Sequence, residues 1–413
     1  MRIAMLAVGT RGDVQPYVAL ARGLQRAGHD IVIGTSANLV GFVHTHGLDA
    51  VAIAGDSTRW MRWLRTERRV RARRGLRLEA TLTAMARDTL CAVRGAALVI
   101  SGATAFWAGQ PIARALGVPH CSAFVQPWHA TSAFPQMLWP DVAAGPAWAR
   151  RAYNRASHRL TLWGIERLAR RTRMRALAAV LGADPPPRAA DPLVLYGFSP
   201  ALVPRPDDWP PNVRVTGAWA LDDGGGWRPP ARLAAFLAEG PAPVYVGFGS
   251  VAGGRPELLR AAVRAVRTSG RRGLLATGWG EWRDPLPAGV LAIDEAPHDW
   301  LLPRMAAVVH HAGAGTTAAA LRAGRPAVVV PLLYDHAFFA RRTWRLGTAP
   351  RPVPARRATV ARLRAAIERA TSDVAMAARA EHVGAIVAGE DGVGRAVELI
   401  ERLAAGPEAI ACG

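Results

Sequence analysis

Residues 310–336 read HHAGAGTTAAALRAGRPAVVVPLLYDH, and this stretch carries most of the information about the fold. An apolar run ends at two histidines, a glycine loop opens a helix-like run, and a second apolar run precedes Asp335 and His336. This strand, loop, helix and strand order is typical of a parallel α/β sheet, which binds ligands at the carboxyl ends of its strands. The stretch therefore predicts a doubly wound domain with a polar site at that edge.

The loop HAGAGTT within this stretch has the composition of an anion site. A helix expected over 316–324 places Gly313 to Thr317 at its N-terminus, where unpaired backbone N–H groups and the helix dipole favour an anion. Gly313 and Gly315 permit close approach of the backbone, and His311 can donate a hydrogen bond. The loop predicts a bound diphosphate, although an ordinary glycine turn with a threonine cap has the same composition.

The chain contains no lysine, because all 52 basic residues are arginine. A lysine P-loop nucleotidase, a Schiff-base enzyme and a protein kinase each require that amine, so these classes are excluded. A D-x-D motif is also missing, and the DD pairs at 207–208 and 222–223 lie in proline- or glycine-rich stretches. We therefore expect a diphosphate held without metal and without a cofactor.

The alternation of apolar runs and helix-like runs occurs twice along the chain. It opens with RIAMLAVG (2–9), a turn TRGD, a helical run at 14–30 and IVIGTS (31–36), and it starts again at PVYVGFGS (243–250). Proline-rich stretches separate the two series. We expect an N-terminal domain over 1–215, a linker over 216–240, a C-terminal domain over 241–392 and a final helix over 393–413.

The bulk properties predict a cytoplasmic protein. Cys91, Cys121 and Cys412 show no paired spacing, which favours a reducing compartment over a disulfide framework or a zinc knuckle. The first apolar run is too short for a signal peptide, and none of the apolar runs reaches the length of a membrane span.

Four segments together resemble a known family. They are GTRGDVQPYVALARGLQRAGHDI (9–31), GFSPALVPRPDDWPPNVRVTGAW (197–219), VYVGFGSV (244–251) and HHAGAGTTAAALRAGRPAVVVPLLYDHAFFARR (310–342). Their order resembles, from end to end, the GT-B glycosyltransferases of family 1, in the bacterial natural-product and sterol glucosyltransferase-like branch. The resemblance implies two Rossmann-like doubly wound parallel-sheet domains with an interdomain cleft, and a C-terminal helix that crosses back to the first domain. The acceptor-binding domain is then the N-terminal one, and the C-terminal domain binds the nucleotide sugar.

The resemblance also implies a role for individual residues. Asp13 matches the general base of this branch. The positions that match the donor site are Thr10, Arg11, Ser250, Ala296, His298, His311, Gly313, Ala314, Gly315, Thr316, Asp335 and His336. Taken alone, Asp13 has the residue type and place of a helix N-cap, and the two roles do not exclude each other.

Two departures from the family pattern bear on the donor. His336 stands where glucose-using relatives have glutamine, which favours galactose or a deoxysugar. Glu295 stands where plant relatives place a stacking tryptophan, so a UDP-sugar and a dTDP-sugar both remain open.

Two arginine-rich segments lie in the N-terminal half, at 59–77 and 150–175, each with nine arginines and one glutamate. Trp60 and Trp63 alternate with arginine, as in interfacial helices, which suggests peripheral contact with an anionic membrane. An acidic partner protein and a merely solvated helix surface are the alternatives. Nucleic acid is not expected, since no nucleic-acid-binding module is present.

Tryptophans and one histidine follow the apolar run PHCSAFV (119–125) of the N-terminal half. Trp128 and His129 are candidate acceptor-binding residues, and Trp139 and Trp148 extend the same apolar segment. Core packing is the alternative for each tryptophan, and a structural role is the alternative for His129.

The sequence thus predicts an enzyme, an inverting and metal-independent glycosyltransferase. A UDP- or dTDP-sugar is the co-substrate, and a hydroxyl of a hydrophobic secondary metabolite, such as a polyketide or macrocycle, is the acceptor. The first alternative is a glycosyltransferase for a membrane lipid, sterol or carotenoid. The others are a non-catalytic auxiliary homologue and a sugar-nucleotide epimerase of the same fold.

Overall fold

The computed structural model describes residues 1–56, 74–142, 144–187, 189–222, 224–249, 255–278, 282, 284–333 and 335–406. Its chain divides into two compact units. Unit 1 comprises Met1–Phe198, Arg205–Trp219 and Asp391–Gly413, and unit 2 comprises Ser199–Pro204 and Ala220–Glu390. Segment 59–77, with Trp60 and Trp63, and Ser250 fall on residues outside the description, except for the helical backbone of 74–77.

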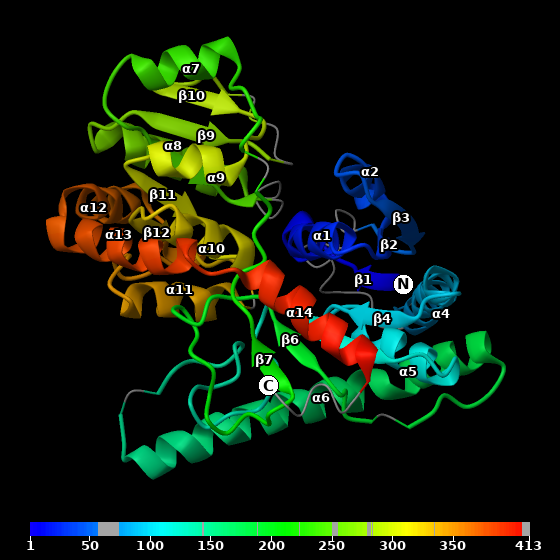
Figure 1. Ribbon diagram of the computed structural model, residues 1–413. Helices are drawn as coiled ribbons and strands as arrows, with labels where there is room; N and C mark the ends of the chain where they lie inside the picture. Colours follow the sequence, from blue (N-terminus) through cyan, green and yellow to red (C-terminus); the bar gives the residue numbers. More distant parts are fainter. Residues whose placement is uncertain are drawn as a thin grey trace. The chain divides into compact units, whose positions relative to one another are not determined.

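Unit 1 is built on a seven-stranded parallel sheet of order β3-β2-β1-β4-β5-β6-β7 (Figure 1). Its strands are β1 (Arg2–Ala7), β2 (Asp30–Ser36), β3 (Asp49–Ile53), β4 (Leu98–Ser101), β5 (His120–Phe124), β6 (Val194–Tyr196) and β7 (Val213–Val215). Its helices are α1 (Arg11–Arg26), η1 (Ala37–Leu39), α2 (Val40–His44), α4 (Arg74–Val93), α5 (Phe106–Ala115), α6 (Ala147–Leu181) and α14 (Gly392–Ala405). The order 3-2-1-4-5-6 is that of a dinucleotide-type doubly wound sheet.

The central strand β1 shows why this sheet forms. Ile3, Met5 and Leu6 are fully buried, as expected for a strand covered by helices on both faces. Burying each such side chain contributes about 1.5–3 kcal/mol. The core of unit 1 therefore lies along the strand whose carboxyl end leads directly into Gly9 and Thr10.

Unit 2 has a five-stranded parallel sheet of order β10-β9-β8-β11-β12 (Figure 1). Its strands are β8 (Val244–Gly247), β9 (Gly273–Ala276), β10 (Val290–Ile293), β11 (Ala307–His310) and β12 (Ala327–Val329). Its helices are α7 (Ala231–Ala238), α8 (Pro256–Thr268), α9 (His298–Leu301), η3 (Leu302–Arg304), α10 (Ala314–Arg322), α11 (His336–Arg345), η4 (Ala355–Arg357), α12 (Val360–Ser372) and α13 (Val374–Ala388).

Two apolar clusters cover the two faces of this second sheet. Val244 and Val246 of β8 pack with α8 and α12. Tyr245, the residue between them, packs with α7, α9 and α10 instead. This alternation is the two-residue period of a strand, and it makes the unit doubly wound as predicted.

The structure differs from the predicted elements at three places. Helix α1 begins at Arg11 rather than at Val14, so TRGD is the first turn of the helix and not a separate turn. Strands β6 and β7 border a proline-rich stretch that was expected only to separate the two halves of the chain. Helix α7 occupies part of the segment 216–240 that was expected to be linker.

Among the described residues, the helices lack a segment both long and apolar enough to cross a membrane.

Candidate functional site

The carboxyl edge of the unit 2 sheet brings together most of the residues predicted for an anion site. Strand β11 ends at His310, Gly313 is the N-cap of α10, and the first intrahelical hydrogen bond runs from the Thr317 N–H to the Gly313 carbonyl at 2.9 Å. The N–H groups of the first three helical residues therefore point out of the helix start. A Cβ added at Gly315 would meet nothing within 4 Å, so the backbone is open to a ligand there.

His311 lies at this edge with its imidazole held between two glycines. A Cβ at Gly313 would lie 2.5 Å from His311 Nε2, and a Cβ at Gly249 would lie 3.0 Å from His311 Cε1. Gly249 also has a φ of +59°, in the left-handed region that favours glycine. Ser250 of the GFGS motif was predicted for the donor site, whereas no signal in the sequence marked Gly249, whose missing side chain makes room for the ring.

His336 lies against His311, with ring centroids 4.8 Å apart at 68°. Its Nδ1 accepts hydrogen bonds from the N–H groups of Leu332 at 3.4 Å and Leu333 at 3.2 Å. This assigns the ring hydrogen of the neutral tautomer to Nε2, which lies 4.0 Å from Asp335 Oδ1. Asp335 is the N-cap residue of α11, so both polar residues follow β12 at the same edge as His311.

Both imidazoles are neutral at pH 7. Burial, together with the nearby ring of His336, lowers the pKa of His311 to about 3. Burial lowers the pKa of His336 to about 4. His310, fully buried behind them, has its pKa lowered in the same direction by burial and then by His311. The pair therefore offers hydrogen bonds rather than positive charge to an unliganded site.

Ala296 and His298 follow β10 at this edge. Strand β10 is at one end of the sheet, and β12 is at the other end. The Tyr245 hydroxyl lies 3.4 Å from His298 Nε2, with the rings edge to face at 5.9 Å. Ala296 packs at the border of the apolar cluster that contains Tyr245. No signal in the sequence marked Tyr245, whose partner is 53 residues away.

At the carboxyl edge of the unit 1 sheet, Asp13 is fixed by a reciprocal capping box. Its Oδ2 accepts the Thr10 N–H and the Thr10 hydroxyl, both at 2.9 Å. Thr10 is the N-cap of α1 and Asp13 is the third helical residue, so the expectation of Asp13 as the N-cap was wrong. A Cβ at Gly9, which has a φ of +146°, would lie 2.5 Å from the same carboxylate oxygen. Gly9 is thus required for this position of Asp13.

Arg11, the first residue of α1, is held within unit 1. Its Nε donates to Gln15 Oε1 at 3.3 Å, and its guanidinium lies 4.7 Å from the centre of the Phe42 ring. These contacts fix the side chain beside α2, the helix to which Phe42 belongs.

Trp128 and His129 follow β5 at the same edge as Asp13. The Tyr196 hydroxyl accepts the N–H groups of Trp128 at 3.0 Å and His129 at 2.9 Å, and it lies 2.7 Å from His129 Nδ1. Burial raises the pKa of Tyr196 and lowers that of His129, so the phenol donates its hydrogen to Nδ1. The neutral His129 then carries its hydrogen on Nε2.

The other two tryptophans of the segment have different surroundings. Trp139 donates its indole N–H to the Thr161 hydroxyl at 2.8 Å. Trp148 is 73% exposed on α6, so core packing, the alternative considered for it, is wrong.

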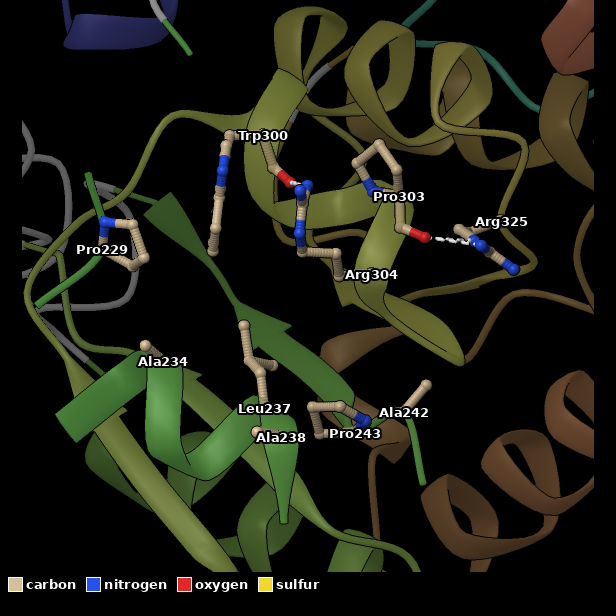
Figure 2. Close-up of a pocket in the computed structure, with 10 residues that line it drawn as sticks. All are labelled: Pro229, Ala234, Leu237, Ala238, Ala242, Pro243, Trp300, Pro303, Arg304 and Arg325. Carbon is tan, nitrogen blue, oxygen red and sulfur yellow. Dashed lines mark hydrogen bonds between the residues drawn. The ribbon is translucent and has the colours of Figure 1, made fainter. Parts of the chain in front are cut away.

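A separate hollow of about 600 Å³ lies at the opposite, amino edge of the unit 2 sheet (Figure 2). Pro243 precedes β8, Arg304 precedes β11 and Arg325 precedes β12. Arg304 lies over the Trp300 ring at 4.1 Å, and Arg325 Nε donates to the Pro303 carbonyl at 2.9 Å. Its lining is otherwise mostly apolar, and the residues predicted for the donor site lie elsewhere.

Two family models match the chain. Residues 3–135 match the N-terminal domain of glycosyltransferase family 28, and residues 278–398 match the C-terminal domain of proteins like erythromycin biosynthesis protein CIII. In the part of the chain that the structure describes, three or more His, Cys, Asp or Glu side chains do not gather in a way that could hold a metal ion.

Relatives match nearly the whole chain. An O-mycaminosyltylonolide 6-deoxyallosyltransferase from Streptomyces fradiae is 38% identical over 98% of both chains. A sterol 3-beta-glucosyltransferase from Neosartorya fischeri is 33% identical over 97% of this chain, which spans only 29% of that longer protein.

Solved structures share the fold. The glycosyltransferase of kitacinnamycin has a TM-score of 0.69 at 21% identity, over 97% of this chain and 98% of that one. The glycosyltransferase VinC in complex with dTDP has a TM-score of 0.68 at 23% identity, over 98% of this chain and 100% of that one. These likenesses confirm the predicted pair of parallel-sheet domains. The chain is therefore a glycosyltransferase of the GT-B family, in the branch that contains bacterial natural-product and sterol glycosyltransferases.

Proposed function

We propose that this enzyme transfers a sugar, with inversion, from a nucleotide diphosphate donor to a hydroxyl of a macrolide-type acceptor. The acceptor oxygen forms a bond to the anomeric carbon as the bond from that carbon to the diphosphate oxygen breaks. The hydroxyl proton passes to Asp13, and the electron pair of the broken bond leaves with the diphosphate. The donor is bound by unit 2 and the acceptor by unit 1.

The observation that carries this proposal is the start of α10 beside the paired imidazoles of His311 and His336. The leaving diphosphate gains negative charge, and preorganised N–H donors stabilise such charge without a metal ion. The first-turn N–H groups of α10 are donors of this kind, and the His311 ring lies beside them. A bound anion also offsets the burial that keeps His311 neutral.

We propose a dTDP-activated deoxysugar as the donor, ahead of a UDP-sugar. The name of the Streptomyces fradiae relative specifies a 6-deoxyallosyl group, and VinC was solved with dTDP. His336 in place of glutamine supports a sugar other than glucose. Its Nδ1 is occupied by two backbone N–H groups, so only the Nε2 hydrogen is left for a sugar hydroxyl.

Asp13 is proposed as the base because its carboxylate is already oriented. Both hydrogen bonds from Thr10 go to Oδ2, and they hold in place the carboxylate that we propose takes the proton. A carboxylate within reach of the hydroxyl contributes roughly 10²- to 10⁴-fold to the rate.

We assign the acceptor to the segment that contains Trp128 and His129. The hydrogen on His129 Nε2 suits a carbonyl or ether oxygen, groups in which macrolides are rich. The compartment we propose is the cytoplasm, in line with the free state of Cys91 and Cys121.

The first test is donor binding, followed by thermal stability. The purified enzyme is titrated with UDP, dTDP and their glucose, galactose and rhamnose forms. Saturation to 100 times Kd stabilises the folded state by about 2.7 kcal/mol. We expect the largest shift with a dTDP-deoxysugar, lost in His311→Ala and retained in His382→Ala, a control on the exposed surface of α13. Equal failure of every nucleotide to shift the unfolding temperature would contradict the proposal.

A second candidate, sterol glycosylation, rests on the fungal relatives. The same donor is then offered with a macrolide aglycone and with a sterol, and the products are separated by mass. Exclusive conversion of the sterol would replace the macrolide proposal.

A further inference from the structure

Helix α6 carries an unusual concentration of exposed apolar side chains. Within the described residues, thirteen large apolar side chains are exposed, and five of them lie on this one helix: Trp148, Leu160, Leu162, Trp163 and Leu168. From Arg159 to Arg175 no side chain of α6 is buried. The exposed fractions reach 62% for Trp163 and 85% for Leu168. Scattered exposed apolar residues are normal, but a cluster on one element marks an interaction surface.

The same helix is strongly basic, with nine arginines against one glutamate. Six exposed residues repeat at helical spacing and share one side of α6, here named the basic face: Trp148, Arg155, Arg159, Trp163, Arg167 and Arg170. The Arg167 guanidinium lies 5.8 Å from the centre of the Trp163 ring. Arg155 of this face lies 3.7 Å from Asp208. Asp208 in turn accepts the Ser132 N–H at 2.7 Å, which anchors that end of the helix to unit 1.

We propose that the basic face docks on a membrane surface that contains anionic lipid. Arginine side chains are attracted to anionic headgroups and extend along apolar stems, while tryptophan prefers the boundary between headgroups and acyl chains. The interleaving of Trp148 and Trp163 with arginine matches this combination. A nucleic acid would use the arginines but gives no reason for leucines at this exposure.

The purpose of such docking rests on the proposed function. A hydrophobic acceptor partitions into a bilayer, so an enzyme held at its surface meets a raised local concentration of acceptor. The docking itself does not depend on the acceptor. Its failure would leave nucleotide binding by unit 2 untouched, and the two proposals are therefore tested separately.

The charge is tested with the full chain and two sets of vesicles, phosphatidylcholine alone and phosphatidylcholine with about a third phosphatidylglycerol. We expect sedimentation with the anionic vesicles only, weakened by salt. Each surface arginine is worth about fivefold in partitioning, so Arg159→Gln, Arg167→Gln and Arg170→Gln together should reduce it on the order of a hundredfold. The matched control removes three exposed arginines of unit 2: Arg232, Arg362 and Arg364. It should change partitioning by less than a tenth of that.

The apolar part is tested with Trp148→Ala and Trp163→Ala together, against Trp344→Ala on α11, which is 43% exposed in the wild type. We expect the double variant to lose at least tenfold in partitioning at unchanged charge, and the control to bind like the wild type. All of these side chains are on the surface, and circular dichroism verifies folding.

Three results would overturn the proposal. The first is that the wild type does not bind anionic vesicles. The second is that the α6 and unit 2 triple arginine variants lose partitioning equally. The third is that the tryptophan double variant binds as well as the wild type. Retention on immobilised polyglutamate without vesicle binding would assign the basic face to an acidic protein instead.

Discussion

Lowering the pH from 7 to 5 is expected to destabilise unit 2 through its buried histidines. His311 and His336 have folded-state pKa values of about 3 and about 4, while an unfolded histidine titrates near 6.5. Between these values the unfolded chain binds more protons than the folded one, so stability falls as the pH drops. At pH 5 each of the two histidines lowers the free energy of unfolding by about 2 kcal/mol. This figure is the 1.5 units between pH 6.5 and pH 5 multiplied by about 1.4 kcal/mol per unit.

His336→Asn isolates one of the two contributions. The asparagine Oδ1 takes the place of Nδ1, which accepts the N–H groups of Leu332 and Leu333, so the start of α11 keeps its contacts. The variant has no titrating ring, and its loss of stability between pH 7 and pH 5 should be about 2 kcal/mol smaller than that of the wild type. His310, whose pKa is also lowered by burial, contributes equally to both proteins.

The assay is urea unfolding of the full chain at both pH values, followed by circular dichroism and tryptophan fluorescence. His382→Asn, at an exposed position of α13, is the control and should behave like the wild type. If His336→Asn loses as much stability as the wild type, the ring of His336 is protonated in the folded enzyme. The neutral state of the buried pair His311 and His336 would then be refuted.

Three further predictions concern the two sheet edges. Asp13→Asn keeps an acceptor for the Thr10 N–H, so its turnover should fall roughly 10²- to 10⁴-fold with little change in unfolding temperature. Asp13→Ala should lose both activity and about 1 kcal/mol of folding stability. Equal turnover by Asp13→Asn and the wild type would exclude Asp13 as the base. Gly315→Val fills open space at the start of α10, and calorimetry should show at least tenfold weaker dTDP binding by a stably folded protein; unchanged affinity would place the diphosphate elsewhere. Tyr196→Phe removes the hydroxyl that accepts the N–H groups of Trp128 and His129, which should lower folding stability by about 1–3 kcal/mol. Steady-state kinetics should show a raised KM for the acceptor substrate but not for the sugar donor. A raised donor KM would contradict the assignment of this segment to the acceptor substrate.

Local patterns predicted most of the fold and the glycine loop that opens α10. The strands are short apolar runs, a pattern that is sufficient to predict buried strands. The glycine loop after β11 is recognisable from residues 311–317 alone. Because the loop and its flanking elements form one continuous β-loop-α-β unit, the local sequence was sufficient to predict them.

What the sequence could not predict depends on distant partners. The tautomer of His129 is set by Tyr196, which is 67 residues away, and His298 meets Tyr245 across 53 residues. The start of α1 was misplaced because threonine and aspartate are both good caps, and only the reciprocal bonds decide between Thr10 and Asp13. Strands β6 and β7 have three residues each, too few to show a periodicity beside so many prolines.

The division of the chain also fixes the order in which the units can be completed. Unit 1 receives α14 only after unit 2 has been synthesised, and α14 packs on α1 where a Cβ at Gly23 would overlap Val393. His29 of unit 1 also meets Glu401 of this helix at 3.2 Å. Domains of a nascent chain usually fold from the N-terminus onward. Here the second unit can mature first, while the Gly23 side of α1 stays uncovered until α14 has been synthesised.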